Sequence, residues 1–325
     1  MSPRPPVAIF QEEAIREVIS IDRETIDVIE QAFCLSAKVE VSMPPMMQIL
    51  THGHGGQTCV KGAWMPGLEY FAVKLSSIYP RPPGMQAAEA NGMFVLVESA
   101  TGRIKACLLD NGYLTQLRTA AAGAVAAQHL APTFVETVGT IGAGKQALWQ
   151  LVAAHLVRPF KHVAIWSRRV EQAAALAKRV ESLLPVSATA VMTIREAIAP
   201  AQLVLTTTSS CQSLLTEHDL HPTLHITAMG SDAKGKRELS DALLREVDLY
   251  VADDLGQCRA YGELQTLPER EIACVATLSG IIAGRNEGRR DSSHVTVADL
   301  TGLGIQDTAI AIAAYRRLVP ESRSE

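Results

Sequence analysis

Apolar residues in the second part of the chain are spaced in two alternating ways, which predicts a layered α/β domain. Short aliphatic, β-branched runs recur from Val135 onward, and apolar residues between several of them have helical spacing. Helices are expected at residues 146–156 and 171–184. Strands that alternate with helices form a parallel, doubly wound sheet of the Rossmann type. The expected strands span residues 137–141, 163–166, 188–192, 203–207, 225–229 and 249–252.

The first part of the chain has a different pattern, which predicts a smaller α+β domain. Helical stretches at residues 12–18 and 23–36 precede several short alternating segments. Thr101-Gly102 marks a turn between the last two segments and indicates an antiparallel meander. The segments expected to be strands span residues 57–63, 70–76, 92–98 and 104–109.

Two further helices define the expected domain boundaries. An Ala-rich helix at residues 114–130 connects the meander to the α/β part, and a C-terminal helix at 308–318 is expected to return to the first domain. We therefore expect one domain from residues 1–130 with 306–325 and a second from residues 131–305.

A glycine-rich turn joins the first strand of the second domain to its first helix. It reads G-x-G-x-x-A from Gly142 to Ala147, a motif that is weak alone but stronger in this strand–turn–helix context. Gly142 permits a tight turn, and Gly144 lets the backbone approach a pyrophosphate at the helix N-terminus. A merely structural glycine turn is the alternative. The turn residues expected to contact a dinucleotide are Gly142, Ala143, Gly144, Lys145 and Gln146.

The end of the second strand of this domain bears on the choice of dinucleotide. NAD-selective sites usually carry Asp or Glu there, to bind the ribose 2′-hydroxyl. This chain has Ser167-Arg168-Arg169, and a 2′-phosphate suits a hydroxyl and two guanidinium groups. We expect NADP(H) to be preferred, with NAD(H) possible. Alternatively, Arg168 and Arg169 only solvate the start of the next helix.

Composition excludes several other functions. The 325 residues carry a formal net charge of −4, which argues against a nucleic-acid-binding surface. The six cysteines form no C-x-x-C pair, and the histidines lack partners at metal-ligand spacing, so neither a disulfide framework nor a metal site is expected. The N-terminus lacks the apolar core of a signal peptide, and the run at 120–127 is too short to span a bilayer. We therefore expect a cytoplasmic protein.

Several ordered blocks of the chain resemble the ornithine cyclodeaminase/mu-crystallin family, and the likeness covers nearly the whole chain. The sequences of residues 111–113 and 299–302 most resemble those of family members from ectoine breakdown and of iminosuccinate reductases. The resemblance implies an NAD(P)-binding domain and a substrate-binding domain that forms a homodimer. The matching blocks span residues 71–74, 109–115, 117–123, 141–147, 206–208, 230–239 and 299–307.

The resemblance also implies an activity. Family members reduce an imine beside a carboxylate or oxidise an amino acid to that imine, so an oxidoreductase acting on a carbon–nitrogen bond is the leading hypothesis. Ornithine cyclodeaminase is the alternative, a lyase that uses bound NAD and releases ammonia to give proline. A non-enzymatic ligand-binding protein like mu-crystallin is a second alternative.

Three side chains are the expected centre of this chemistry. Arg118 matches the substrate-binding arginine of the family, and its planar fork suits a carboxylate, although a salt bridge is the other interpretation. Lys74, in an apolar strand, is expected to move a proton or orient the imine, unless it only extends to the surface. Asp232 follows a strand and could exchange a proton with nitrogen, or could cap a turn.

Other positions are implied by the matching blocks or depart from them. Thr207, Thr208 and Gly230 lie in blocks expected to bind the cofactor. Met46 stands where several relatives carry a basic residue, so an apolar wall replaces a positive charge. Glu89 could face a basic group of the substrate or the solvent. Both departures weaken a claim to ornithine as the substrate.

Overall fold

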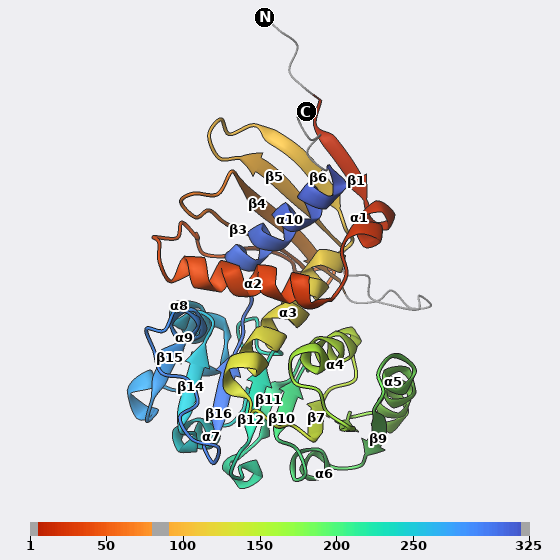
Figure 1. Cartoon of the computed structure of the whole chain (residues 1–325), viewed down its shortest axis with the longest axis vertical. Helices are drawn as coiled ribbons and strands as arrows, with labels where there is room; N and C mark the ends of the chain where they lie inside the picture. Colours follow the sequence, from red (N-terminus) through yellow and green to blue (C-terminus); the bar gives the residue numbers. More distant parts are fainter. Residues whose placement is uncertain (1–5, 80–90, 320–325) are drawn as a thin grey trace, which may run out of the picture. The chain divides into compact units, whose positions relative to one another are not determined.

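The chain folds into two compact units (Figure 1), and its computed structural model describes residues 6–79 and 91–319. Unit 1 comprises Met1–Ser20, Asp27–Arg118 and Leu303–Glu325, and unit 2 comprises Ile21–Ile26 and Thr119–Gly302. These units differ from the expected domains at three places. Ile21–Ile26 and residues 119–130 of the Ala-rich helix lie in unit 2, and residues 303–305 lie in unit 1.

Unit 1 contains a six-stranded sheet in the order β1-β6-β5-β4-β3-β2. The predicted meander is confirmed, because β2 to β6 pair antiparallel in succession, and Gly102 (φ +68°) lies in the β5–β6 turn. The sequence analysis missed β1, which pairs parallel with β6, and β2. The strands are β1 (Ala8–Gln11), β2 (Met47–Thr51), β3 (Gly56–Ala63), β4 (Tyr70–Ile78), β5 (Asn91–Glu98) and β6 (Ile104–Leu109).

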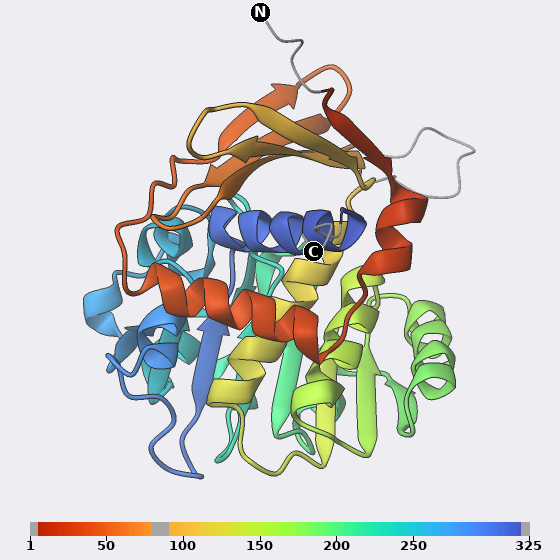
Figure 2. The same ribbon diagram turned by 45° about the horizontal axis from the view of Figure 1, so that its top comes forward.

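Helix α10 (Gly304–Leu318) packs against β3 and β4 and covers one face of this sheet, as Figure 2 shows. The predicted return of the C-terminal helix to the first domain is therefore confirmed. The Thr308 hydroxyl fixes the position of the helix, because it donates to the Ala63 carbonyl (2.7 Å) and accepts from the Ala72 N–H (3.1 Å). The other helices with residues in unit 1 are α1 (Glu12–Val18), α2 (Arg23–Ser36) and α3 (Tyr113–Leu130), of which α2 and α3 continue across the unit boundary.

Unit 2 contains an eight-stranded parallel sheet in the order β15-β14-β16-β12-β10-β7-β8-β9. The chain runs from β7 outward to β9 and then returns to β10 on the other side of β7, so the predicted doubly wound fold is confirmed. The sequence analysis missed β15 and β16. The strands are β7 (Thr137–Ile141), β8 (His162–Trp166), β9 (Ser187–Val191), β10 (Leu203–Thr206), β12 (His225–Ala228), β14 (Leu249–Ala252), β15 (Val275–Thr277) and β16 (Thr296–Asp299).

Helices pack against this sheet, with α5 on β8 and β9 and α6 on β7. A small separate sheet pairs β11 (Cys211–Leu215) with β13 (Arg237–Leu239). The core is built from aliphatic side chains such as Val204, Ile226 and Val297, all fully buried. The helices of unit 2 not yet bounded are α4 (Lys145–Val157), α5 (Val170–Leu183), α6 (Ile194–Ile198), α7 (Asp241–Glu246), α8 (Leu255–Tyr261) and α9 (Leu278–Ile282), with short 3₁₀ turns at Glu217–Asp219, Glu263–Gln265 and Glu269–Glu271.

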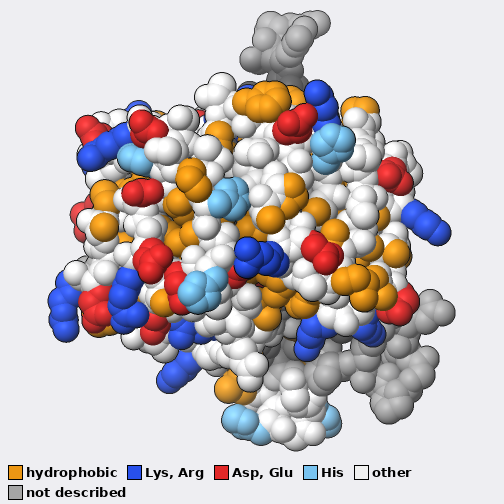
Figure 3. Space-filling model, turned by 90° about the horizontal axis from the view of Figure 1, so that it is seen from below, with side chains coloured by type: hydrophobic (Ala, Val, Ile, Leu, Met, Phe, Trp, Pro, Cys, Tyr) orange, Lys and Arg blue, Asp and Glu red, His pale blue; other side chains and the backbone are white. Residues whose placement is uncertain are grey.

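The surface shows charged side chains of both signs. On the face drawn in Figure 3, acidic and basic groups of the described residues are interspersed among uncharged ones. None of the helices within residues 6–79 and 91–319 is long and apolar enough to cross a membrane. The same residues include no group of three or more His, Cys, Asp or Glu side chains placed to bind a metal ion.

Candidate functional site

The glycine turn between β7 and α4 has the geometry that a dinucleotide needs. Gly142 adopts φ +117°, and a Cβ atom there would lie 2.7 Å from Thr207 Oγ1, so only glycine fits. Gly144, the N-cap of α4, faces open space, because a Cβ atom there would meet nothing within 4 Å. The turn therefore leaves room for a phosphate at the N-terminus of a 13-residue helix.

A cavity of about 540 Å³ adjoins this turn. Its lining residues come from three places, which are the turn after β7 and the segments that follow β8 and β10. Thr207 Oγ1 is buried there without a hydrogen-bond partner in the described part of the chain, as expected for a polar atom that a ligand would satisfy. The predicted cofactor residues that line the cavity are Gly142, Ala143, Gly144, Ser167, Arg168, Arg169, Thr207 and Thr208.

Three predicted cofactor residues do not line this cavity. Lys145 is the exposed first residue of α4, and the Gln146 side chain accepts a hydrogen bond from Gln150 (3.3 Å). Gly230 follows β12, the next strand beyond β10.

Arg168 and Arg169 are both exposed, and neither forms an ion pair with a carboxylate among residues 6–79 and 91–319. The Ser167 hydroxyl oxygen accepts from the Arg169 backbone N–H at 3.4 Å. The end of β8 therefore presents two uncompensated positive charges to the cavity.

Unit 1 contains a buried basic cluster, which we define as Lys74 on β4, Arg118 on α3 and Asp307 on α10. The Lys74 ammonium lies 2.9 Å from both carboxylate oxygens of Asp307. Arg118 Nε lies 2.9 Å from Asp307 Oδ1, an ion pair rather than a well-aligned hydrogen bond, and Arg118 Nη1 donates to Gln306 at 2.8 Å. The structure thus brings together two of the predicted residues, Lys74 and Arg118.

The electrostatics of the basic cluster differ from those of a surface ion pair. Burial and the Arg118 charge lower the pKa of Lys74 to about 7, although Asp307 opposes this change. Burial alone would raise the pKa of Asp307, but Arg118 and Lys74 outweigh it and the net pKa is lowered, so Asp307 is an anion. Lys61, directly opposite Lys74 on β3, also lowers the pKa of Lys74 by its charge. Arg118, Lys74 and Lys61 all lower the pKa of Asp307, so basic charge surrounds this carboxylate and favours an anion nearby.

The sequence analysis named neither Asp307 nor Gln306 as a site residue. Both are fully buried, as is Thr308. The available signal was a run of three consecutive polar residues near the start of a helix, followed by six apolar residues. Their partners are more than 180 residues away in the sequence, so local pattern could not identify the contacts.

The remaining predicted site residues lie elsewhere. Asp232 is in unit 2, exposed, and its carboxylate lies 2.5 Å from the Lys236 ammonium. Met46 is half-buried just before β2. Glu89 lies outside the described residues 6–79 and 91–319.

The doubly wound sheet and its glycine turn define a dinucleotide-binding protein, and comparisons with known proteins identify its family. The sequence profile of the ornithine cyclodeaminase/mu-crystallin family matches residues 7–322. The chain is 41% identical over 318 residues to an uncharacterised cyclodeaminase of Sinorhizobium fredii, covering 96% of each protein. It is 35% identical over 258 residues to the iminosuccinate reductase of Paracoccus denitrificans, covering 78% of each.

Solved structures agree with this assignment. An archaeal alanine dehydrogenase dimer with bound NAD is similar with a TM-score of 0.87 and 29% identity, covering 96% of this chain and 95% of that one. The Δ1-pyrroline-2-carboxylate reductase of Thermococcus litoralis, in complex with NADH and L-proline, has a TM-score of 0.88 and 25% identity, covering 96% and 97%. The chain belongs to the ornithine cyclodeaminase/mu-crystallin family. The predicted family, and the expectation of an enzyme rather than a binding protein, are confirmed.

We predict that Asp307→Asn destabilises the protein by about 3–5 kcal/mol, because two buried cations lose their common anion. Denaturant unfolding measures the change, with Asp27→Asn, an exposed aspartate on α2, as the matched control. A change in the free energy of unfolding below about 1 kcal/mol would show that the basic cluster does not depend on Asp307.

Proposed function

We propose that the protein reduces the carbon–nitrogen double bond of an α-imino acid, or oxidises the matching amino acid, with a nicotinamide dinucleotide. The observation that carries this proposal is the buried basic cluster, which offers an anchor for a carboxylate and a lysine with a pKa of about 7. Reductases of imino acids and an amino-acid dehydrogenase among the relatives support it. When bound, the dinucleotide supplies or accepts the hydride.

Arg118 is the proposed anchor for the substrate carboxylate. Asp307 and Gln306 occupy its Nε and Nη1 atoms and orient the guanidinium plane. Its Nη2 atom makes no hydrogen bond within the described part of the chain and remains available to a ligand. The nearby charge of Lys61 adds to the attraction for an anion.

Lys74 and Asp232 are the proposed groups for proton transfer. A lysine with a pKa of about 7 exchanges a proton readily near neutral pH, which suits a general acid or base. Asp232 follows β12, at the carboxyl edge of the sheet where open α/β sheets bind their ligands. Its exposed carboxylate could exchange a proton with the substrate nitrogen after its ion pair with Lys236 breaks.

The cyclodeaminase activity is the second candidate, supported by the name of the relative in Sinorhizobium fredii. The two activities differ in whether external cofactor is consumed. Oxidation of NADPH and NADH should be followed with cyclic and acyclic imino acids, and ammonia release should be followed with ornithine and no added cofactor. Stoichiometric cofactor oxidation supports the reductase, and ammonia release without net oxidation supports the lyase.

We also propose that the protein prefers NADP(H) to NAD(H). The alanine dehydrogenase and pyrroline-2-carboxylate reductase structures contain NAD and NADH, so this preference would distinguish the chain from those two proteins. It rests on Ser167, Arg168 and Arg169, which line the cavity where an NAD-selective site would carry a carboxylate.

We predict that replacing Arg168 and Arg169 together by Ala weakens NADPH binding by about 1.5–3 kcal/mol and changes NADH binding little. The reason is the loss of charge-assisted contacts to the 2′-phosphate. Titration calorimetry measures both affinities. The matched control replaces Lys178 and Arg179 of α5, which are exposed and do not line the cavity. Equal losses for both cofactors would contradict the preference.

We predict that Arg118→Lys raises KM and lowers kcat/KM by ~10–100-fold, because the charge remains but the fork is lost. Asp232→Asn and Lys74→Met should each lower kcat by ~10²-fold and leave cofactor binding intact.

The reductive rate should also depend on pH. In the reductive direction protonated Lys74 is the donor, so the wild-type rate should fall as the pH rises through about 7, and Lys74→Met should abolish this fall in rate. Near-normal kcat in both variants would direct attention to Lys61 and Glu89.

The outer face of the unit 1 sheet supports a homodimer. Because Lys74 and its alternate neighbours on β4 point inward, Val73 and Leu75 point outward. Cross-strand register aligns two apolar rows on that outer face, and such a surface is typical of an interface. The first row is Val73, Val95, Cys107 and Ile9, and the second is Met47, Val60, Leu75 and Met93.

We predict a dimer at micromolar concentration that Leu75→Lys converts to monomer. Leu75 is 40% exposed, and a charge there would have to be buried in the interface. Sedimentation velocity measures the state, with Leu183→Lys, an exposed leucine on α5 of unit 2, as the control. A wild-type protein that is monomeric and active would refute the dimer.

We further propose a cytoplasmic location. The six cysteines lie within residues 6–79 and 91–319, and none of them forms a disulfide bond there. Cysteines that form no disulfide are typical of proteins in a reducing compartment.

A further inference from the structure

The Glu238 side chain on β13 is fully buried and accepts three hydrogen bonds. Its Oε2 atom accepts from the Thr206 hydroxyl (2.5 Å) and the Gly230 N–H (2.8 Å), and its Oε1 atom accepts from the Thr208 N–H (2.6 Å). Thr206 ends β10, and Gly230 follows β12, the neighbouring parallel strand. One carboxylate therefore joins the two segments that leave the sheet side by side.

The packing at this point requires both the glycine and the carboxylate. A Cβ atom at position 230 would lie 2.4 Å from Glu238 Cδ and 2.3 Å from the Thr208 carbonyl oxygen. Any larger residue would force the two segments apart. Gly230 and Glu238 are also the two ends of one loop, which carries Asp232, so the same hydrogen bond closes that loop.

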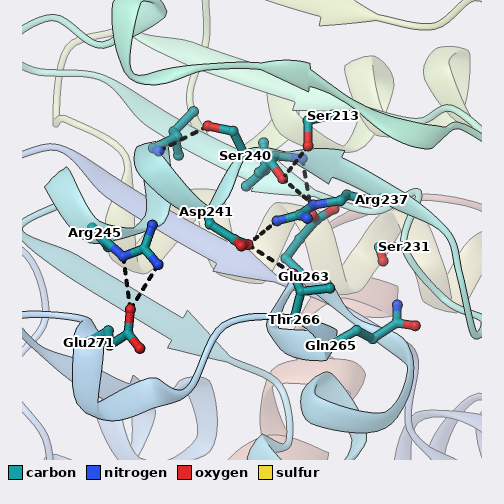
Figure 4. Close-up of polar contacts among 12 residues, drawn as sticks. Ser213, Ser231, Arg237, Ser240, Asp241, Arg245, Glu263, Gln265, Thr266 and Glu271 are labelled. Atoms are coloured by element: carbon teal, nitrogen blue, oxygen red, sulfur yellow. Dashed lines mark hydrogen bonds and ion pairs between the residues drawn. The ribbon is translucent and has the colours of Figure 1, made fainter.

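Neighbouring residues also fix the backbone of β13, on which Glu238 lies. The Glu263 carboxylate accepts from the backbone N–H groups of Glu238 (2.9 Å) and Leu239 (3.0 Å). Arg237 Nε donates to the Leu239 carbonyl (2.8 Å), and the guanidinium pairs with Asp241, as Figure 4 shows. The backbone of Glu238 is thus fixed by hydrogen bonds that do not involve the two segments bound by its side chain.

Burying this carboxylate is costly for the fold. Burial raises the pKa of Glu238, and the donors of Thr206, Thr208 and Gly230 oppose that change. No lysine or arginine among residues 6–79 and 91–319 forms an ion pair with it. An apolar side chain would avoid this penalty but would leave the Thr208 and Gly230 N–H groups without an acceptor, so joining the two segments explains the buried carboxylate.

The two joined segments lie where one half of a dinucleotide would bind. Thr207 and Thr208 line the cavity beside the glycine turn after β7. Strand β8, with Arg168 and Arg169 after it, lies on one side of β7, and β10 and β12 lie on the other. A dinucleotide bound across this switch point would have its adenosine half at β8 and its nicotinamide half at β10 and β12.

We propose that Glu238 is a positioning residue for the nicotinamide half of the cofactor, which acts by fixing Thr206–Thr208 and the Gly230–Glu238 loop relative to each other. This inference rests on the proposed use of a nicotinamide dinucleotide. It concerns neither the adenosine half nor the choice between NADP(H) and NAD(H).

Glu238→Gln tests the proposal, because the amide NH₂ cannot accept and one of the three donors must face another donor. Binding of NADH is compared with that of ADP-ribose, which lacks the nicotinamide ring, and NADPH is compared with 2′-phospho-ADP-ribose. We expect the Kd of the complete cofactors to rise about tenfold or more and that of the truncated ligands to stay within about twofold. We also expect kcat to fall while the KM for the imino acid changes less.

Two other variants complete the experiment. Thr206→Val removes one donor from the carboxylate, keeps the shape of the strand residue and should give a smaller change of the same kind, even if Glu238→Gln does not fold. Glu271→Gln alters the exposed ion pair with Arg245 (2.8 Å, Figure 4) and should change neither ligand's affinity.

Equal weakening of complete and truncated ligands, or none, in Glu238→Gln and Thr206→Val would overturn the proposal and leave Glu238 with a purely structural role. Failure of the proposed function would look different. In that case wild-type protein would bind NADH but oxidise none of it with any imino acid.

Discussion

The burial of Asp307 is the constraint on which the arrangement of unit 1 depends. A carboxylate with no exposed surface must be neutralised where it lies, since an unpaired buried charge would be prohibitively unstable. Lys74 and Arg118 supply that neutralisation from two other elements, so β4, α3 and α10 have to meet at one point. Thr308, the next residue, fixes the same helix to β3 and β4 through neutral hydrogen bonds. The orientation of the Arg118 fork is therefore a consequence of packing as much as of chemistry.

Unit 2 handles its buried carboxylates in a different way. Asp253 and Glu238 accept mainly from backbone N–H groups and hydroxyls, without an ion pair to a described lysine or arginine. Burial raises the pKa of Asp253, and burial followed by the charge of Asp253 raises that of Asp299 to about 7, with the Tyr250 hydroxyl opposing it. Backbone donors are fixed in position. A carboxylate bound by them therefore defines loop geometry better than a carboxylate paired with a flexible lysine would. Unit 1 thus uses buried charge to join three of its elements, and unit 2 uses it to order the ends of its strands.

Periodicity predicted most of the fold because each strand and helix buries one face. Strand β6 and helices α1 and α2 have the predicted bounds, and the glycine turn lies where the motif required. Strand β2 was missed because four of its five side chains are exposed, and β16 because its Thr and Asp side chains are polar yet fully buried. The roles of Asp307 and Glu238 could not be predicted, since they depend on partners 233 and 32 residues away. Lys74 and Arg118 could be named as candidates because residue type and the family resemblance agreed, and the structure brings both to Asp307.

The close approach of Gly230 to Glu238 also bears on how this family can vary in sequence. A side chain at position 230 would overlap the carboxylate, and a shorter residue at 238 would leave the Gly230 N–H without an acceptor. Neither position can change alone without loss, so substitutions should occur together or not at all. Positions 230 and 238 should then change together among relatives. Relatives that keep Gly and Glu at these positions should also keep this arrangement of strand ends, and relatives that change both should have a different one.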